Sequence, residues 1–522
     1  MAVVCARAVG AASRRLKRGG GTALPGLVAE RVDPALVAHL ARQLGGGRVI
    51  VTGTNGKTTT SRMLAEMVRI AGRAPVHNRS GSNLMRGLAA TLAGHAGGDG
   101  RIPDARQRAG IFEVDEATIP QAVAAIRPQA LVIGNLFRDQ LDRYGEVDSI
   151  TALWRQAIAR LPTETALVLN ADDPTVATLA HDFAGRSVFF GVDDADQATM
   201  SEHAADSRWC GRCGAEYRYD HAFFWHIGHW RCPGCGEQRP SADVAATRVR
   251  DNGEGVALAL RTPAGSLSPS LPLNGLYNVY NALAATTAAL ALRVPTGDVG
   301  RGISGFSAAF GRQESLTIDG RSVRILLCKN PAGVNQVLRT ILTDPEPLRL
   351  LFLLNDGIAD GRDISWIWDV DFELLRHRTE IAIAGGQRAA DMALRLKYAD
   401  LTPPAPLPSQ GRGEFSSTVG GSISVGSGGA IPIEPTPDQT PPASSKETIV
   451  QSSRVRTPPS LRGKGAGGLG IHLEPTIPDA VARLLAATPI GGRAYVLPTY
   501  TAMLDVRDLL AARAGERRFW EH

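Results

Sequence analysis

Short apolar runs alternate with stretches of helical periodicity through the first part of the chain. Val49–Val51 has the pattern of a buried strand, and a glycine-rich turn and a helix from about Thr58 follow it. Four more runs share the strand pattern: Gly110–Val114, Ala130–Asn135, Ala166–Asn170 and Ser187–Gly191. Strands that alternate with helices predict a mainly parallel sheet that is covered by helices on both faces.

The pattern changes after this first unit. Residues 208–238 are rich in Cys, Trp, His and Gly, which indicates a small inserted module. A strand-rich stretch from about Val256 to Leu273 and helices from Tyr277 to about Gly305 follow the module. A second α/β unit is predicted to begin near Ser315. Its expected strands are Val323–Leu327, Arg349–Asn355, Glu380–Ala384 and Arg493–Leu497, with helices such as Ala389–Tyr398 and Pro478–Ala487.

Residues 401–470 interrupt this second unit. The segment is rich in Pro, Gly and Ser, and Phe415 is its only aromatic residue. Such a composition cannot bury enough apolar area to offset the entropy of an ordered chain. We therefore predict a disordered insertion between a helix and a strand.

Length and charge narrow the class of protein. The chain has 522 residues, too many for one ordinary core, so two or three domains are expected. No apolar run is long enough for a membrane-spanning helix. The basic N-terminus lacks the long apolar core of a signal peptide, which predicts a cytoplasmic location. The net charge of +6 is modest for this length and argues against a nucleic-acid partner.

A local cluster of basic residues lies within residues 1–47. Its members are Arg7, Arg14, Arg15, Lys17 and Arg18. The simplest interpretation is a solvated helix face. The alternative is a weak contact with anionic lipid or with a pyrophosphate head group.

A phosphate-binding loop is predicted at residues 52–60, which spell TGTNGKTTT between the first strand and its helix. Backbone N–H groups of such a turn converge on phosphate oxygens, and the helix N-terminus adds a positive dipole. We expect Lys57 to bridge the outer phosphates of ATP and the hydroxyl of Thr58 to bind Mg²⁺. The residues expected to contact ATP here are Gly53, Thr54, Asn55, Gly56, Lys57, Thr58 and Thr59.

Three carboxylates, Glu113, Asp115 and Glu116, follow another predicted strand. The carboxyl ends of parallel strands meet at one edge of a sheet, so these groups are expected beside the phosphate-binding loop. Carboxylate oxygens suit a hard cation such as Mg²⁺. A solvated acidic turn is the alternative interpretation.

Four of the six cysteines form two Cys-x-x-Cys pairs, Cys210 with Cys213 and Cys232 with Cys235, separated by 18 residues. Four thiolates at this spacing predict a closed tetrahedral zinc site, which is structural because no position is open for water. Cys5 and Cys328 stand alone and are expected to be inert apolar residues. The histidines of the module, His221, His226 and His229, are expected to be ordinary surface or packing residues.

Several segments carry a family resemblance. The sequence of residues 52–60 is more specific than the general pattern of a phosphate-binding loop. It resembles the signature of the Mur ligase superfamily, which includes folylpolyglutamate synthases. Residues 135–145, NLFRDQLDRYG, resemble a segment that reads DHLDRHG in many Mur ligases, with Gln140 where those have a metal-binding histidine. Residues 170–174 and 274–285 also resemble ligase motifs.

This resemblance implies roles for further residues. Glu113 matches the glutamate that holds Mg²⁺ in Mur ligases. Asn278 and Asn281 lie one helical turn apart and suit an adenine edge, with helix capping as the alternative. Residues 310–314, FGRQE, resemble the hinge into the last ligase domain, where Arg312 would meet a phosphate.

Residues 359–369, ADGRDISWIWD, resemble the C-terminal domain that is peculiar to MurT-type subunits, and KNPAG at 329–333 fits the same branch. By resemblance, the chain is identified as a member of this MurT type. The resemblance implies an α/β fold in which a Mur-ligase-type P-loop ATPase domain with an inserted zinc ribbon precedes a smaller α/β domain.

The domain bounds that we expect follow from these segments. An N-terminal basic segment occupies residues 1–47. The ATPase domain occupies residues 48–314, with the zinc ribbon inserted at 208–238. The C-terminal domain occupies residues 315–522 and contains the disordered insertion.

The resemblance also implies an activity. MurT-type subunits use ATP and Mg²⁺ to activate the α-carboxylate of D-isoglutamate in lipid II, at the inner face of the membrane, and Lys57 and Glu113 would be catalytic. They pair with a GatD-type glutaminase, which supplies ammonia. An aspartate of the C-terminal domain is implied to complete the partner's Cys–His–Asp arrangement. Asp360 is the expected residue, with Asp356 and Asp363 as alternatives.

Two other functions stay open at this point. One is an amino-acid-adding ligase of the Mur or folylpolyglutamate synthase type. The zinc insertion, the segment 359–369 and a leading segment too short for a UDP-binding domain disfavour it. The other is a non-enzymatic zinc-ribbon protein that binds nucleic acid, which the phosphate-binding loop disfavours.

Deletion of residues 401–470 should change the melting temperature of the protein by only a few degrees, because a disordered segment contributes no buried apolar area. Thermal unfolding of the full and shortened chains measures this. A drop of more than about 10 °C would show that the insertion is folded.

Overall fold

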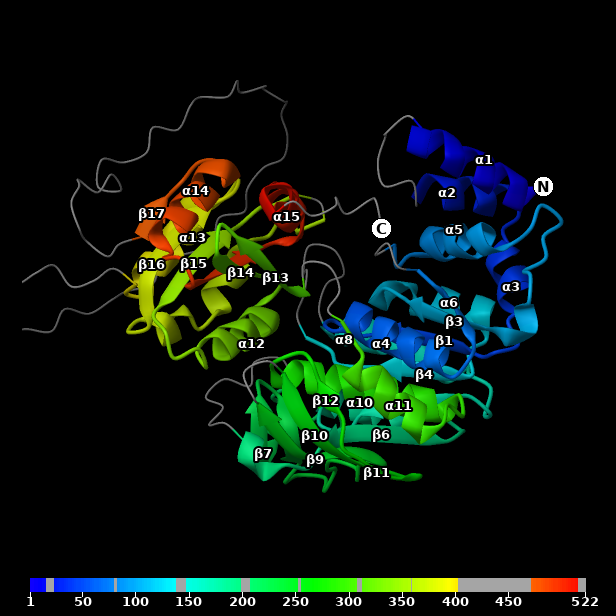
Figure 1. Ribbon diagram of the computed structural model, residues 1–522. Coiled ribbons are helices and arrows are strands. Elements are labelled where there is room, and N and C mark those ends of the chain that lie inside the picture. The colour runs from blue at the N-terminus through cyan, green and yellow to red at the C-terminus, as the bar shows by residue number, and fades with distance from the viewer. Residues whose placement is uncertain are drawn as a thin grey trace, which may run out of the picture. The chain divides into compact units, whose positions relative to one another are not determined.

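The structure is a computed structural model of the chain (Figure 1). It describes residues 1–15, 23–78, 82–137, 147–198, 207–251, 255–307, 312–357, 359–401 and 471–514. The predicted insertion therefore lies outside the described residues, apart from Leu401. That residue is 7% exposed and packs into a core cluster of the second α/β unit, although the predicted insertion included it.

The larger sheet has ten strands within the described residues, in the order β11-β10-β9-β6-β5-β4-β1-β3-β2, with β12 beside β10. Neighbours from β9 to β2 run parallel, whereas β10, β11 and β12 join antiparallel. The bounds are β1 Arg48–Thr52, β2 Ala74–His77, β3 Arg108–Glu113, β4 Ala130–Ile133, β5 Ala166–Asn170, β6 Ser187–Val192, β9 Val244–Asp251, β10 Val256–Thr262, β11 Gly265–Leu267 and β12 Ser270–Leu271. The mainly parallel sheet is confirmed, whereas β2 and β9 were not predicted.

Helices cover both faces of this sheet because side chains along each strand alternate between them. In β1, Val49 and Val51 pack into the cluster of α4 and α10, whereas Ile50 packs into the cluster on the opposite face. The first face carries α4 Lys57–Ile70, α10 Leu276–Ala291 and α11 Thr296–Ser304 (Figure 1). The other face carries α5 Met85–His95, α6 Ile119–Ile126, α8 Val147–Ile158 and the short α9 Pro174–Ala177.

The leading residues form three helices that belong to the same core. They are α1 Ala2–Arg15, α2 Ala23–Val32 and α3 Leu36–Ala41. Val3, Ala29 and Leu40 are buried in one cluster with Leu88 and Leu92 of α5. The N-terminal basic segment therefore also packs over α5. Of its predicted basic cluster, the side chain of Arg7 is described; those of Arg14, Arg15, Lys17 and Arg18 lie outside the described residues.

Close approach of α2 to α5 depends on one small residue. A Cβ on Gly26 would lie 1.6 Å from the backbone oxygen of Arg86. No side chain larger than hydrogen fits this crossing without moving one of the two helices.

The second sheet has six strands within the described part of the chain, in the order β13-β14-β18-β15-β16-β17, and β13 is antiparallel to β14 while the others are parallel. Its strands are β13 Arg312–Ile318, β14 Arg321–Leu326, β15 Leu348–Leu353, β16 Thr379–Gly385, β17 Ile471–Leu473 and β18 Arg493–Pro498. Its helices are α12 Pro331–Ile341 and α13 Ala389–Tyr398 on one face, and α14 Ile477–Ala487 and α15 Tyr500–Ala514 on the other. The expected second α/β unit is confirmed, whereas the exact domain bounds stay a prediction.

The module between β6 and β9 contains a two-stranded antiparallel hairpin, β7 Arg218–Phe224 and β8 Ile227–Arg231. The four predicted zinc ligands flank it. Across the described ranges, no helix has both the length and the apolar character that a membrane span requires.

Candidate active site

The turn between β1 and α4 has the backbone of a phosphate-binding loop. Gly53 and Gly56 have φ angles of 133° and 84°, which favour glycine. A Cβ on Gly56 would lie 1.9 Å from the side-chain oxygen of Asn281, so contact as well as conformation requires glycine. Among the described residues, no side chain caps α4, which begins at Lys57. The helix N-terminus thus has the geometry of an anion-binding site.

Lys57 is folded back into this loop. Its Nζ donates to the carbonyl oxygens of Gly53 at 2.6 Å and Thr54 at 3.2 Å, and it forms an ion pair with Oε1 of Glu116 at 2.6 Å. Both charged side chains are 8% exposed. Trp154 Nε1 donates to the backbone oxygen of Glu116 at 3.0 Å and fixes the acidic turn. The sequence had placed Glu116 only in a possible metal cluster; its position here is that of the charge partner of Lys57.

Thr58 and Glu113 lie together as the sequence predicted. The Thr58 hydroxyl donates to Glu113 Oε2 at 2.7 Å. The side chain of Asn78, which is 1% exposed, hydrogen-bonds both the N–H and the C=O of Glu113, at 2.9 and 2.8 Å. A hydroxyl and a carboxylate oxygen side by side fit the preference of Mg²⁺ for hard oxygen ligands. The third predicted carboxylate, Asp115, is buried and accepts from Ala117 N instead.

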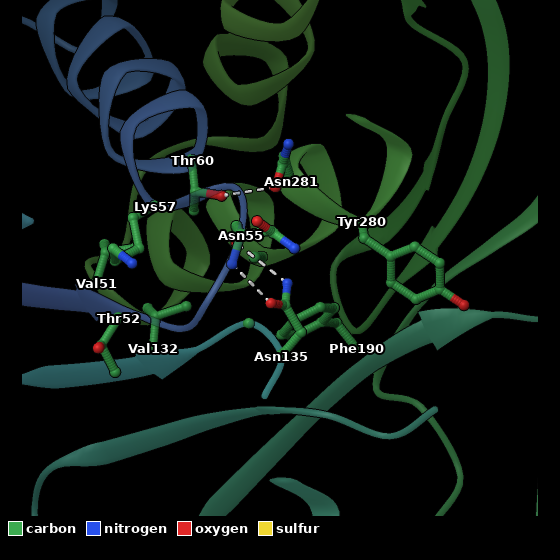
Figure 2. Close-up of a pocket in the computed structure, with 12 residues that line it drawn as sticks. Val51, Thr52, Asn55, Lys57, Thr60, Val132, Asn135, Phe190, Tyr280 and Asn281 are labelled. Atoms are coloured by element: carbon green, nitrogen blue, oxygen red, sulfur yellow. Dashed lines mark hydrogen bonds between the residues drawn. The ribbon is translucent and has the colours of Figure 1, made fainter. Parts of the chain in front are cut away.

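Hydrogen bonds to the segment at the end of β4 support the loop. The Asn135 amide accepts from Asn55 N at 2.9 Å and donates to Asn55 O at 3.1 Å (Figure 2). The Thr54 hydroxyl accepts from Phe137 N at 2.9 Å and donates to Phe137 O at 3.0 Å. These four bonds fix the middle of the loop. Asn135 and Phe137 were not predicted as site residues, although both lie at the end of a predicted strand.

A pocket beside the loop is lined by Asn281 of α10 together with Asn55, Lys57 and Thr60, and Asn278 contacts Asn281. Asn281 Nδ2 donates to Asn278 Oδ1 at 3.1 Å. The Thr60 hydroxyl donates to Asn281 Oδ1 at 3.4 Å (Figure 2). Both asparagine side chains of α10 are more than nine-tenths buried. Contact with adenine stays a prediction for this pair.

Other predicted residues are placed as follows. Thr59 is buried in the first turn of α4. Arg312 opens β13, but its side chain, like the whole of Gln140, is outside the described residues. Asn330 caps α12 by accepting from Gly333 N at 2.8 Å, and it exchanges side-chain hydrogen bonds of 3.0 and 3.3 Å with Asn55.

The four cysteine sulfurs converge. All lie within 4.8 Å of one another, with Sγ–Sγ distances of 3.6 Å for Cys210 and Cys235 and 3.3 Å for Cys213 and Cys232. The two Cys-x-x-Cys turns have similar geometry: the glycine after each, Gly214 and Gly236, has a φ angle of 73° and 75°, respectively. Sulfurs that share a tetrahedral zinc ion lie about 3.8 Å apart, given Zn–S bonds of about 2.3 Å.

One of these thiols, Cys210, has a lowered pKa that suits a metal ligand, whereas the pKa values of Cys213 and Cys235 are raised in the cluster of four thiols. Burial by itself would raise the pKa of the Cys210 thiol, but backbone N–H groups of Arg212 and Cys213 bring it down to about 6. A thiolate is the ligand form of cysteine. The cluster therefore fits zinc in both geometry and chemistry.

The acidic loop after β15 separates the three candidate aspartates. Asp360 is 6% exposed and accepts from the N–H and the hydroxyl of Thr501 at the start of α15, at 2.7 and 2.5 Å. Asp356 pairs with Arg388 at 2.9 Å. Asp363 is exposed and accepts from Ser365 N at 2.8 Å.

Comparison with known proteins decides the family. Residues 51–214 match the Mur ligase middle domain, and residues 327–409 match the MurT ligase C-terminal domain. The lipid II isoglutaminyl synthase (glutamine-hydrolyzing) subunit MurT of Streptococcus pneumoniae (strain ATCC BAA-255 / R6) is 33% identical over 383 residues, or 73% of this chain and 82% of that protein. The chain belongs to the MurT family. The MurT subunit of Staphylococcus aureus (strain COL) is 32% identical over 74% of this chain and 84% of its own length.

Solved structures agree with a Mur ligase fold for this MurT protein. A pseudomurein peptide ligase type C from Methanothermus fervidus superposes with a TM-score of 0.61 at 20% identity, covering 90% of this chain and 78% of that one. MurF from Thermotoga maritima in complex with ADP gives 0.58 at 11% identity, covering 93% and 84%. At these identities the likeness concerns the fold. Family membership makes the chain an enzyme, a ligase of the group that uses ATP and Mg²⁺.

Replacement of Cys210 by Ser should remove zinc from the protein and lower its melting temperature, because the metal closes the module between β6 and β9. Metal analysis should find about one zinc per wild-type chain and well under half of that in the variant. Cys5→Ser is the matched control and should keep its zinc. Equal zinc in all three proteins would contradict the assignment.

Proposed function

We propose that this MurT protein amidates the α-carboxylate of D-glutamate in the lipid II stem peptide, in an ATP-dependent reaction that uses ammonia from a GatD-type glutaminase. The reaction would proceed at the inner face of the membrane, where lipid II is held. Both relatives are by name the MurT subunit of a glutamine-hydrolyzing lipid II isoglutaminyl synthase, which supports both the product and the need for a partner.

The loop around Lys57 is the single observation that carries this proposal. It combines an uncapped helix N-terminus, a buried lysine and the Thr58 hydroxyl, which is hydrogen-bonded to the carboxylate of Glu113 in β3. Glu116 neutralises Lys57 in the structure, and phosphate oxygens of ATP would compete with that carboxylate for Nζ. The bound ADP of the MurF structure supports nucleotide binding at the corresponding fold.

The chemistry follows from these groups. A carboxylate does not react with ammonia near neutral pH, so it must first be activated. Attack of a carboxylate oxygen on the γ-phosphorus of ATP releases ADP and forms an acyl phosphate. Ammonia then attacks the acyl carbon, inorganic phosphate leaves, and the nitrogen loses a proton to give the amide. Lys57 and the loop amides stabilise the negative charge that shifts between phosphate oxygens. Mg²⁺, held by Thr58 and Glu113, would add Lewis-acid stabilisation.

The cysteines of this chain support an external ammonia source. Four of the six belong to the predicted zinc cluster, and Cys5 lies in α1. Cys328 is 5% exposed, and burial raises its pKa far above the ordinary value, so it is a poor nucleophile. Glutamine hydrolysis by a Cys–His site is therefore assigned to the partner subunit.

The direct test supplies the purified chain with lipid II, ATP, magnesium and ammonium and detects the amidated stem by mass spectrometry. We expect product from the wild-type protein and a loss of at least about a thousandfold in rate for Lys57→Ala, because charge on the transferring phosphoryl group would lose its cation. Arg69→Ala, an exposed substitution on the same helix, is the control. No product from the wild type, or full activity in Lys57→Ala, would refute the proposal.

Asp360→Asn should reduce amidation driven by glutamine more than amidation driven by ammonium, if Asp360 completes the partner's site. Because Asp360 also binds the first turn of α15, the variant should lose about 1–3 kcal/mol of unfolding free energy as well. Measuring both nitrogen sources separates the two effects. Asp356→Asn and Asp363→Asn serve as comparisons within the same loop, and equal loss with both nitrogen sources would make Asp360 purely structural.

A further inference from the structure

The tip of the β7–β8 hairpin points into the body of the ATPase domain. Trp225 and His226 form its two-residue turn, and Trp225 has a φ angle of 50°. This left-handed conformation disfavours a bulky residue and persists only where surrounding contacts enforce it. Trp225 lies edge-on to Phe137, with ring centroids 6.4 Å apart. The strained turn is therefore held against the segment that follows β4.

His226 is the innermost residue of this tip. Its side chain is fully buried, and its ring centroid lies 4.7 Å from that of Phe137. Nε2 lies 3.3 Å from Oδ2 of Asp173, which is also fully buried. Nδ1 has no hydrogen-bond partner within the described residues. Because only Nε2 faces an acceptor, the geometry assigns a ring proton to Nε2.

Asp173 connects this histidine to the phosphate-binding loop. Its Oδ2, the oxygen that faces His226, also accepts from Leu136 N at 2.9 Å. The next residue, Phe137, exchanges two hydrogen bonds with the hydroxyl of Thr54 in the loop. Leu136, which donates to the Asp173 carboxylate, is thus the direct neighbour of Phe137, which is hydrogen-bonded to Thr54 in the loop.

Further contacts seat the hairpin on the end of β5. Gly228 N donates to Asp172 O at 2.8 Å, and Trp230 Nε1 donates to Ala171 O at 2.9 Å. Asp172 in turn accepts from the hydroxyl of Tyr280 at 2.6 Å, and Tyr280 lines the pocket beside Lys57 (Figure 2). The hairpin of the cysteine module is thus joined to the nucleotide pocket through buried side chains.

We propose that His226 is a positioning residue for nucleotide binding: it orients Asp173, and through the segment after β4 it holds Thr54 and the loop in the conformation that receives phosphate. This inference rests on the proposed function only in that the loop binds ATP. It gives the inserted hairpin a task inside the active site that is separate from holding metal.

The test measures ATP affinity of the full chain by isothermal titration in the presence of magnesium. His226→Leu removes the donor to Asp173 and should weaken ATP binding about tenfold or more. His226→Gln can place an amide N–H near the position of Nε2 and should stay within about threefold of the wild type. Rescue by glutamine is a response that loss of packing alone would not give.

Controls separate this role from general damage. His221 lies on the same hairpin, is partly exposed, and faces His229, so His221→Leu should leave ATP affinity unchanged. Zinc content should equal that of the wild type in every variant. If His226→Leu does not fold, His226→Asn replaces it, because the shorter amide cannot reach Asp173 and should bind ATP weakly while His226→Gln binds normally.

Equal ATP affinity in His226→Leu and the wild type would overturn the inference, and so would a glutamine variant as weak as the leucine or asparagine variant. Both results leave the proposed function intact if the wild type binds ATP and Lys57→Ala does not. A wild-type protein without ATP affinity would instead overturn the proposed function itself.

Discussion

Reciprocal hydrogen bonds between the Lys57 loop and the end of β4 are the constraint on which the rest of the site depends. Asn135 satisfies the backbone of Asn55, and Thr54 and Phe137 satisfy each other. A buried polar group left without a partner costs about 1–3 kcal/mol, so the loop keeps its shape only while β1 and β4 keep their register. Ile50 pairs with Leu131 in that register, and both are fully buried.

Much of the fold could be predicted because buried parallel strands are continuous apolar runs. The run at Ala166–Asn170 matched β5 residue for residue. β9 was missed because its sequence, VAATRVRD, mixes charged and apolar positions on a half-exposed strand. A helix face was expected near the basic residues of the first segment, but the packing of this segment on α5 was missed. Much of the contact between α1, α2 and α5 is made by alanine and glycine, which leave little hydrophobic signal.

The candidate site also contains residues that could be predicted from the sequence and residues that could not. Lys57, Thr58 and the four cysteines carry their chemistry in short contiguous motifs, which a sequence displays directly. Residues that act through the fold are not visible in this way: Glu116 meets Lys57 across 59 positions, and Asn135 meets Asn55 across 80. His226 was taken for an ordinary packing residue, since nothing local distinguishes it from the histidines beside it. Only strand order brings it to Asp173, 53 positions away.

The crossing of α2 over α5 limits how the start of the chain can change in evolution. With a hydrogen atom at Gly26, the two helix backbones touch, and a methyl group would wedge them apart. Solvent-exposed positions of these first helices can be substituted freely, because they make no packing contacts with the core. At the crossing point itself only glycine fits. Glycine should therefore be kept at this position even in relatives whose first helices differ strongly in sequence.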